Sequence, residues 1–318
     1  MDVTEEELLE AIRRVCSGVG PEVRVGVGDD AAVLAPTTGE LVITTDALVE
    51  HVHFELGSTS ARDLGYKAIA VNVSDVAAMG ASPRAALCQL SLPGEVEAAW
   101  VMELFGGMRE ACDEYALWLV GGNLSRAGEL EIVVTVTGEV APGRAVLRSG
   151  AHPGDLLVVT GDLGASAAGL RLSRERSIAN DEERALIRRW LRPTARVGEG
   201  ASLARAGATA MIDLSDGLSL DLTRLCRASR VGAAIELDAV PVAHGATLPE
   251  ALGGGEDYEL LAALPTAAAA DEAGRELEDG FGVALTAIGT VVEGAGVTAT
   301  GADGTPRPLE ATGWDHFA

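Results

Sequence analysis

The sequence predicts an α/β protein of two domains, each built from helices and mixed sheets. Three observations predict this fold class. The chain has 318 residues, roughly twice the ~150 residues of an average domain. Helix-like and strand-like segments are interspersed along its whole length. Residues 141–155 are rich in Pro and Gly, which is typical of a linker. We therefore expect domains at residues 1–141 and 142–318.

In the first domain, two capping boxes mark the starts of helices. The pattern Thr4–Glu7 predicts a helix to about residue 17, and the pattern Ser60–Asp63 predicts a helix that ends at Gly80. Apolar side chains fill 47 % of the sequence but aromatic ones only 3 %, so Ala, Val and Leu must form most of the core. Their spacing predicts strands over 23–27, 41–45, 85–91, 117–120 and 130–140, and a helix over 95–115.

The second domain is expected to begin with a strand over 156–160 and a helix from about Ala165. A further helix covers 181–191 and stops before Pro193, which cannot continue it. A strand over 208–212 leads through Asp213-Leu214-Ser215-Asp216-Gly217 into a helix that ends near Ser229. The remaining expected elements are strands over 233–237, 258–263 and 283–292, and a helix that includes the alanines 267–270.

The charge of the chain restricts its partners. The net charge is −24, which argues against binding to nucleic acid or to an anionic membrane and is compatible with binding divalent cations. Lys67 is the only lysine and does not follow a glycine, so a P-loop is excluded. The N-terminus is acidic where a signal peptide is basic, and no apolar run approaches the ~18 residues of a membrane span. We expect a cytoplasmic protein.

The four cysteines are far apart and form no C-x-x-C pair. In a cytoplasmic protein this pattern predicts buried thiols and neither a disulfide framework nor a zinc site.

Several aspartates follow strands or lie among small residues, where they suit magnesium binding. Mg²⁺ prefers carboxylate and hydroxyl oxygens and usually shares them with substrate phosphates. A buried cluster of carboxylates without cations would be costly. For any single aspartate, a turn or N-cap position on a solvated loop remains an alternative. The candidates are Asp29, Asp30, Asp46, Asp75, Asp213 and Asp216, with the hydroxyls of Thr44, Thr45, Ser74 and Ser215 beside four of them.

Three glycine-rich segments, residues 26–30, 121–126 and 253–258, are expected to form loops. Glycine lets the backbone approach a phosphate closely and present its N–H groups. The helix start after Gly217 would add its dipole. An ordinary turn is the alternative for each segment taken alone.

Three further side chains are binding candidates. Arg148, at the expected linker, carries a guanidinium that suits a nucleotide phosphate, although a surface arginine is the alternative. His53 follows the strand of Asp46 without the further ligands of a zinc site, so an exposed or substrate-facing histidine is expected. Trp314 near the C-terminus either packs as an anchor or stacks on a ring of the substrate.

Taken together, these segments resemble the thiamine-monophosphate kinase family, part of the ATP-binding superfamily that includes aminoimidazole ribonucleotide synthetase and selenophosphate synthetase. Two runs separate this kinase from its relatives: Gly-Glu-Asp-Tyr-Glu-Leu at 255–260, and Gly-Trp-Asp-His-Phe at 313–317, where the family usually has Tyr for Trp314. All matching runs occur in the family's order: 26–32, 44–54, 63–81, 121–126, 148–155, 212–222, 254–260 and 313–317.

The resemblance implies an aminoimidazole-ribonucleotide-synthetase-like fold, with an N-terminal domain for ATP, magnesium and dimerisation and a C-terminal α/β domain. It also implies a homodimer, several Mg²⁺ ions, and transfer of the γ-phosphoryl group of ATP to thiamine monophosphate. It assigns metal binding to Asp30, Thr44, Thr45, Asp46, Asp75, Asn123, Asp213 and Asp216, ATP binding to Gly121, Gly122, Arg148 and Ser215, and substrate binding to His53, Glu256 and Trp314.

One position departs from the family pattern. The family usually has a Mg²⁺-binding Asp where this chain has Asn123, and Asn keeps a carbonyl oxygen but loses the charge. We expect weaker metal binding there. The acceptor phosphate is already ionised near neutral pH, so we expect no general base, and the reaction depends on positioning and charge neutralisation.

Two alternatives remain open. One is another enzyme of the superfamily. Selenophosphate synthetase needs a reactive Cys or Sec near a glycine-rich N-terminal loop, but Cys16 lies in an expected helix, and the hydrogenase-maturation relative needs a C-terminal cysteine that this chain lacks. Aminoimidazole ribonucleotide synthetase is not excluded. The other alternative is a non-catalytic relative that binds ATP or Mg²⁺, which Asn123 favours and the remaining aspartates oppose.

Overall fold

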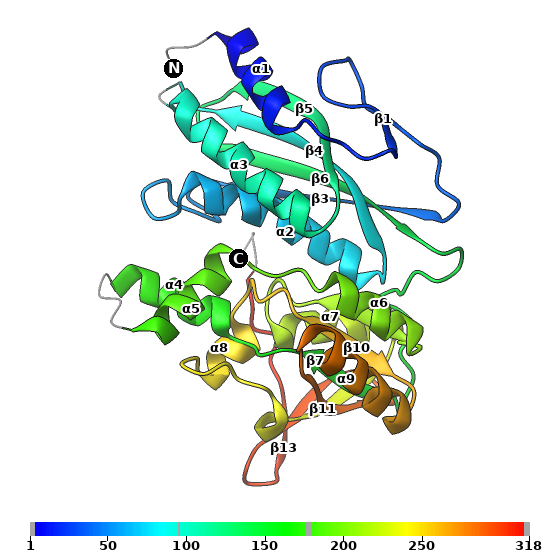
Figure 1. The fold of residues 1–318 in the computed structure, drawn as a ribbon. Coiled ribbons are helices and arrows are strands. Elements are labelled where there is room, and N and C mark those ends of the chain that lie inside the picture. Colours follow the sequence, from blue (N-terminus) through cyan, green and yellow to red (C-terminus); the bar gives the residue numbers. More distant parts are fainter. Residues whose placement is uncertain (1–3, 95, 176–179, 315–318) are drawn as a thin grey trace. The chain divides into compact units, whose positions relative to one another are not determined.

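The computed structural model describes residues 4–94, 96–175 and 180–314, and its chain divides into two compact units (Figure 1). The first unit comprises Met1–Val76 and Ser82–Gly143, and the second comprises Ala77–Ala81 and Arg144–Ala318. The segment 77–81 belongs to the second unit because Ala78 packs against Val146 and Leu203 there. A contiguous first domain that ends at residue 141 does not account for this segment.

The first unit contains a four-stranded sheet of order β3-β6-β4-β5, in which only β4 and β5 run parallel. The first predicted capping box is present, with Thr4 and Glu7 bonded reciprocally. At the second, the N–H of Asp63 donates to Ser60 Oγ at 3.1 Å, and the Ser60 hydroxyl donates to the Asp63 carboxylate at 2.7 Å. The elements are α1 (Glu5–Val15), β1 (Val23–Val25), β2 (Val33–Leu34), β3 (Glu40–Val49), α2 (Ala61–Ala78), β4 (Ser82–Leu92), α3 (Ala98–Glu114), β5 (Trp118–Arg126) and β6 (Glu131–Val140).

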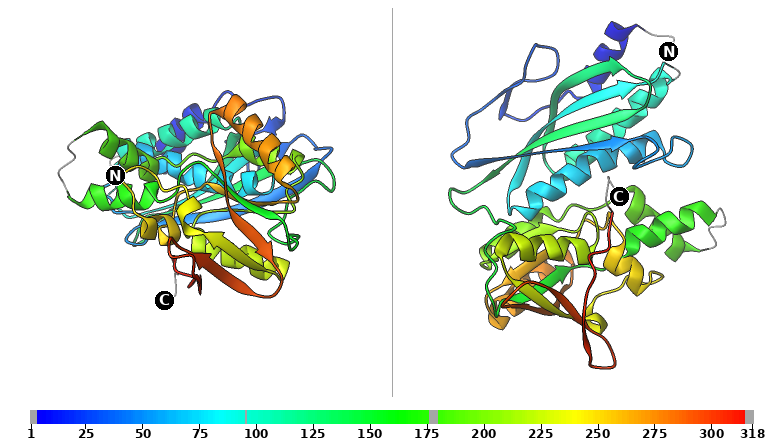
Figure 2. Two further views of the ribbon diagram at one scale, coloured as in Figure 1. Left: turned by 90° about the horizontal axis from the view of Figure 1, so that it is seen from below. Right: turned by 180° about the vertical axis from the view of Figure 1, so that it is seen from behind.

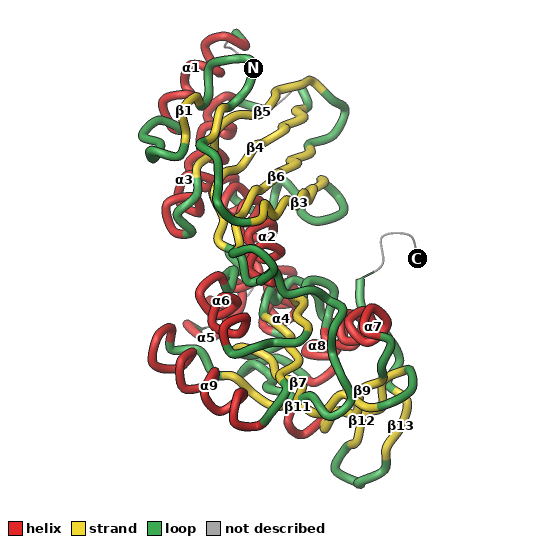
Figure 3. The backbone as a smooth tube through the Cα atoms, turned by 90° about the vertical axis from the view of Figure 1, so that its right-hand side faces the viewer, coloured by secondary structure: helices red, strands yellow, loops and turns green. Residues whose placement is uncertain are grey.

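Helices cover one face of this sheet and leave the other open (Figure 3). Along β6, Ile132, Val134 and Val136 are fully buried, whereas the residues between them are partly exposed. Gly65 of α2 and Gly107 of α3 let the two helix backbones touch, since a Cβ on either glycine would lie within 2 Å of a carbonyl oxygen of the other helix. The unit's core therefore lies between these helices and the sheet.

The second unit is built on a seven-stranded sheet of order β13-β12-β9-β11-β7-β10-β8. Leu157 and Val159 of β7 join a core with α7 and α8, whereas Val158 joins a core with α6 and α9. Helices thus cover both faces of this sheet (Figures 1 and 2). Its elements are β7 (Leu156–Thr160), α4 (Ala165–Glu175), α5 (Asp181–Leu191), α6 (Val197–Arg205), β8 (Ala210–Asp213), α7 (Leu218–Ser229), β9 (Gly232–Glu236), η1 (Leu237–Ala239), α8 (Leu248–Gly253), β10 (Leu260–Leu264), α9 (Ala267–Phe281), β11 (Leu285–Val292), β12 (Gly296–Thr300) and β13 (Pro306–Pro308).

The predicted fold class, mixed α/β, is confirmed. The four cysteines are buried and free, as predicted. Within the described residues, no helix has both the length and the apolar character needed to cross a membrane.

Candidate functional site

In the first unit, two oxygen side chains that are far apart in sequence meet at the edge of the sheet. Thr44 lies on the edge strand β3, and Asp75 lies in the last turns of α2. Thr44 Oγ1 donates a hydrogen bond to Asp75 Oδ2 at 2.5 Å, and both side chains are half-buried. The strand and the helix together therefore present a hydroxyl and a carboxylate to the same place.

Asp46 is fixed to the same helix through its backbone. Its N–H donates to Oδ1 of Asn72 at 2.9 Å, and the fully buried Asn72 donates in turn to the carbonyl of Ala68. The sequence predicted that Asp46 ends its strand, but β3 continues to Val49. The strand extends further because every residue from Glu40 to Val49 is paired with β6.

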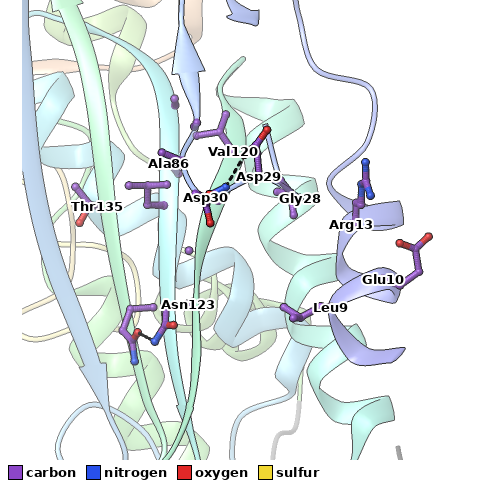
Figure 4. A pocket seen from close by; sticks show the side chains of 18 of the residues that line it. Leu9, Glu10, Arg13, Gly28, Asp29, Asp30, Ala86, Val120, Asn123 and Thr135 are labelled. Carbon is purple, nitrogen blue, oxygen red and sulfur yellow. Dashed lines mark hydrogen bonds between the residues drawn. The ribbon is translucent and has the colours of Figure 1, made fainter. Parts of the chain in front are cut away.

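The open face of the sheet forms part of a pocket of about 1680 Å³, which exceeds the roughly 300–1,000 Å³ of common small-ligand sites. Asp30 and Asn123 line it (Figure 4), and so do Gly121 and Gly122. Asn123 donates from Nδ2 to Gln89 Oε1 at 2.7 Å. Thr45, also on this face, shares a hydrogen bond with Thr135, which lines the pocket. Four predicted ligand positions therefore line one pocket, and Thr45 borders it.

The glycines 121 and 122 lie in a strand, not in the predicted loop. Both belong to β5, and the register with β4 shifts by one residue just before Gly121. Gly122 has a φ of +155°, and a Cβ there would lie 1.8 Å from the carbonyl oxygen of Cys88. Gly122 is therefore needed because β5 approaches β4 closely. In the sequence alone, a glycine required for such close packing cannot be distinguished from a glycine in a loop.

In the second unit, three predicted segments meet where β8 ends and α7 begins. Asp213 is the last residue of β8 and is almost completely buried. The N–H of Glu256 donates to the carbonyl of Ser215 at 2.7 Å, and the N–H of Trp314 donates to the carbonyl of Asp216 at 3.2 Å. Residues predicted to bind metal, ATP and substrate are therefore neighbours here.

Two residues that the sequence analysis missed stabilise this junction. Asp221, which is fully buried, accepts the N–H groups of Asp216 and Gly217, and Arg224 donates to the carboxylates of Asp216 and Asp221. Burial raises the pKa of Asp221 above its usual value, against the opposing effect of the Asp216 N–H. In the sequence, these two residues could have been found from their spacing, because Asp221 and Arg224 follow Asp216 within the first turns of the expected helix.

His53 belongs to the first unit, and Arg148 belongs to the second. His53 lies in the turn after β3, where its Nδ1 accepts the N–H of Val49 at 3.0 Å. Arg148 is exposed, and its carbonyl accepts a hydrogen bond from Ser229 at the C-terminal end of α7. Within the second unit, the Arg148 backbone thus lies at the opposite end of α7 from Ser215.

The chemistry of these donors fits magnesium. They are carboxylate, hydroxyl and amide oxygens, the ligands of a hard cation, and Mg²⁺ commonly uses one or two carboxylates while keeping waters or phosphate oxygens. Across residues 4–94, 96–175 and 180–314, no three His, Cys, Asp or Glu side chains are close enough to hold a metal by themselves. The oxygens instead form smaller groups within each unit, such as Thr44 with Asp75.

Comparison with known proteins decides the family. Models of the AIR synthase related proteins match residues 28–140 with their N-terminal domain and residues 152–302 with their C-terminal domain. A thiamine-monophosphate kinase from Salmonella typhimurium is 42 % identical over 313 residues, which cover 93 % of each chain. The chain belongs to the thiamine-monophosphate kinase family.

Two solved structures extend this likeness to the backbone. The family's enzyme from Stenotrophomonas maltophilia is 36 % identical with a TM-score of 0.84, and the match covers 96 % of this chain and 98 % of that one. The structure of AaThiL complexed with AMPPCP and TMP is 37 % identical with a TM-score of 0.79, covering 98 % and 97 %. The family resemblance inferred from the motifs is confirmed.

Proposed function

We propose that this protein transfers the γ-phosphoryl group of ATP to thiamine monophosphate and forms thiamine diphosphate and ADP. The observation that carries the proposal is the likeness, over nearly the full length of both chains, to a structure complexed with AMPPCP and TMP. The meeting of Ser215, Asp216, Glu256 and Trp314 at one junction supports it. Both substrates are anions, so the protein's task is to neutralise and align them.

Magnesium is the cofactor that these residues would hold. In the first unit its ligands would be Asp30, Thr44, Thr45, Asp46, Asp75 and Asn123, and in the second unit Asp213 and Asp216. Bound Mg²⁺ supplies positive charge that offsets the negative charge of the phosphates. The half-buried Thr44–Asp75 pair and the buried Asp213 support this set, because oxygens held in fixed positions need not be ordered when the cation binds.

The remaining predicted residues bind the two substrates. The backbone at Gly121 and Gly122 and the side chains of Ser215 and Arg148 contact ATP, with Arg148 offsetting phosphate charge. His53, Glu256 and Trp314 orient the thiamine phosphate. Trp314 is 49 % exposed, which leaves its ring accessible for stacking and supports this role over that of a buried anchor.

The protein acts as a homodimer that pairs through its first unit. The open face of the four-stranded sheet supports this proposal, because Leu41 and Ile43 on β3 are 53 % and 61 % exposed, and Leu87 on β4, across the intervening β6, is 43 % exposed. Clustered apolar side chains of this kind mark an interaction surface. A second copy would bury them. We expect no nucleic-acid partner, and the cytoplasmic location remains a prediction from the sequence.

Direct analysis of the product tests the proposed reaction. The purified protein is incubated with ATP, Mg²⁺ and thiamine monophosphate, and in parallel with the substrate of aminoimidazole ribonucleotide synthetase. Chromatography should show thiamine diphosphate and ADP in equal amounts in the first reaction only. Turnover of the second substrate would favour the related synthetase. Binding of ATP without any product would favour a non-catalytic relative.

A further inference from the structure

The backbone on both sides of Asp257 is held in an unfavourable conformation. Glu256 has a φ of +67° and Tyr258 a φ of +52°, which only glycine adopts readily. Such residues persist where the surrounding structure fixes them, and they gather at functional sites. Glu256, the proposed substrate ligand, is therefore presented by a strained segment that something must hold.

Asp257 provides the first anchor. Its side chain is 5 % exposed and accepts two backbone hydrogen bonds at the start of α4, from Gly164 N–H to Oδ2 at 2.6 Å and from Ser166 N–H to Oδ1 at 3.0 Å. Both carboxylate oxygens are used, so the direction of this side chain is set by a second element. Asp257 cannot shift without breaking these bonds at the N-terminus of α4.

Glu259 provides the second anchor. Its side chain is 1 % exposed. Arg196 donates to both of its oxygens, from Nε at 2.7 Å and from Nη2 at 2.5 Å, while Arg189 and Thr160 donate to it at 2.8 and 2.7 Å. Thr160 also accepts the N–H of Leu260 at 2.8 Å. A bidentate arginine pair fixes orientation as well as position.

Three backbone bonds connect the anchored segment to the ATP side of the junction. The N–H of Glu256 donates to Ser215, the N–H of Tyr258 donates to Leu214, and the N–H of Leu214 donates to the carbonyl of Glu259, all within 2.7–3.0 Å. The residue pair Glu256 and Ser215 is thus held in register by the residues on either side of it. The side chains of residues 257 and 259 end in neighbouring elements of the second unit and not at the junction.

We infer that Asp257 and Glu259 are positioning residues, whose carboxylates hold the strained backbone so that Glu256 is ready to receive thiamine monophosphate. The inference rests on the proposed function, in which Glu256 contacts that substrate. Asp257 and Glu259, two charged residues of the Gly-Glu-Asp-Tyr-Glu-Leu run, thus contribute to substrate binding and not only to packing. The proposal requires no contact between either carboxylate and the substrate, because protein donors occupy both.

The test measures binding of thiamine monophosphate by calorimetry in the presence of AMPPCP and Mg²⁺, so that it does not depend on turnover. Asp257→Asn keeps the side-chain shape but cannot accept both N–H groups, and it should raise the Kd for thiamine monophosphate roughly tenfold or more. In a Glu256→Ala background the same change should have no further effect on Kd. This non-additivity is expected only if Asp257 acts through Glu256.

Asp155→Asn is the matched control. Asp155 is also 5 % exposed and also accepts a backbone N–H, from His152 at 2.8 Å, and a hydroxyl, from Thr209 at 2.6 Å, but it lies at the opposite end of β7 from Thr160. Its substitution should leave the Kd within twofold. Equal weakening by Asp155→Asn, or full additivity of Asp257→Asn with Glu256→Ala, would overturn the inference.

A milder variant covers the case in which Asp257→Asn fails to fold. Thr160→Val removes one donor to Glu259 and one acceptor for Leu260, and it should raise the Kd severalfold and speed hydrogen exchange at the N–H of Glu256. An unchanged Kd with unchanged exchange would contradict the positioning role. Binding of thiamine monophosphate without formation of thiamine diphosphate would instead refute the proposed reaction. In that case the effect of each variant on the Kd for thiamine monophosphate would still test the positioning role.

Discussion

Thr44 and Asp75 are joined by a hydrogen bond of 2.5 Å between Oγ1 and Oδ2. The bond links an edge strand to a helix that begins at Ala61, and it lies beside the Asn72 side chain that fixes the backbone of Asp46. Three predicted magnesium ligands are therefore held by one helix. The hydroxyl of Thr44 and the carboxylate of Asp75 are held by their mutual bond, and the buried Asn72 holds the backbone of Asp46.

Asp75→Ala should nearly abolish turnover and leave the fold intact. The substitution removes a carboxylate proposed to bind Mg²⁺ and leaves the Thr44 hydroxyl without its acceptor, a cost of about 1 kcal/mol that a folded domain tolerates. Steady-state kinetics and thermal unfolding check the two parts. Near-normal kcat at saturating Mg²⁺ would show that Asp75 is not a metal ligand. Thr45→Val is the comparison variant. It removes an uncharged proposed ligand on the other face of β3, and its kcat can be compared with that of Asp75→Ala.

Trp314→Ala should raise the KM for thiamine monophosphate severalfold and leave the KM for ATP nearly unchanged. An aromatic stacking contact contributes about 1 kcal/mol, and the ring of Trp314 is half exposed. Trp314→Phe keeps a ring and should restore most of the affinity. An equal rise of both KM values would reject the stacking role.

Asn123→Asp should lower the Mg²⁺ concentration that gives half-maximal activity. The change restores a negative charge in the pocket, although it removes the donor to Gln89. Adding Gln89→Ala to Asn123→Asp tests whether the loss of the hydrogen bond to Gln89 hides an increase in Mg²⁺ affinity. If the Mg²⁺ titration curves of all three proteins coincide, Asn123 does not lie at a metal site.

Ile43→Asp should convert a dimer into monomers. Ile43, on the edge strand β3, is 61 % exposed on the open sheet face, and a charge there would have to be desolvated on pairing. Phe281→Asp, which changes a 46 % exposed residue at the end of α9, is the control and should leave the assembly unchanged. Sedimentation measures both. A mass that is the same for all three chains would place the interface elsewhere.

The stability of the protein should depend on pH through Asp257. Burial raises the pKa of this carboxyl to about 7, although the N–H groups of Gly164 and Ser166 favour its charged form. Because the folded state holds the proton more tightly, the stabilising contribution is complete below about pH 4 and is lost as the pH rises to about 7.

Urea unfolding of the unsubstituted protein and of Asp257→Asn measures this contribution. The difference between their unfolding free energies should change by as much as about 1.4 kcal/mol per pH unit in this range. As the pH rises, the unsubstituted protein should lose stability relative to Asp257→Asn. Parallel curves for the two proteins between pH 4.5 and 7.5 would show that Asp257 titrates normally.

Local sequence signals predicted most of the helices and the main strands because those signals act within a few residues, although α6 was not predicted. The box of Thr4 and Glu7 formed as expected. A similar box, Thr247 with Glu250, was present and begins α8, but it was overlooked. By contrast β13 contains two prolines, which argue against a strand, and it is tolerated because it lies at the edge of its sheet.

The candidate site was less predictable because its geometry depends on contacts between distant residues. No local pattern indicates that the N–H of Glu256 meets the carbonyl of Ser215, or that Thr44 meets Asp75. Gly122 shows the same limit: two adjacent glycines suggest a loop, whereas here they permit two strands to approach. Motifs could nominate candidate residues for the site, but only the fold could show which of these candidates are neighbours.

The most direct test is a coupled assay of ADP release from ATP with thiamine monophosphate, titrated with Mg²⁺. The account predicts that ADP appears only when thiamine monophosphate and Mg²⁺ are both present, and that EDTA stops its release. ADP release that continues in EDTA, or that stays absent at every Mg²⁺ concentration with both substrates supplied, would contradict the account.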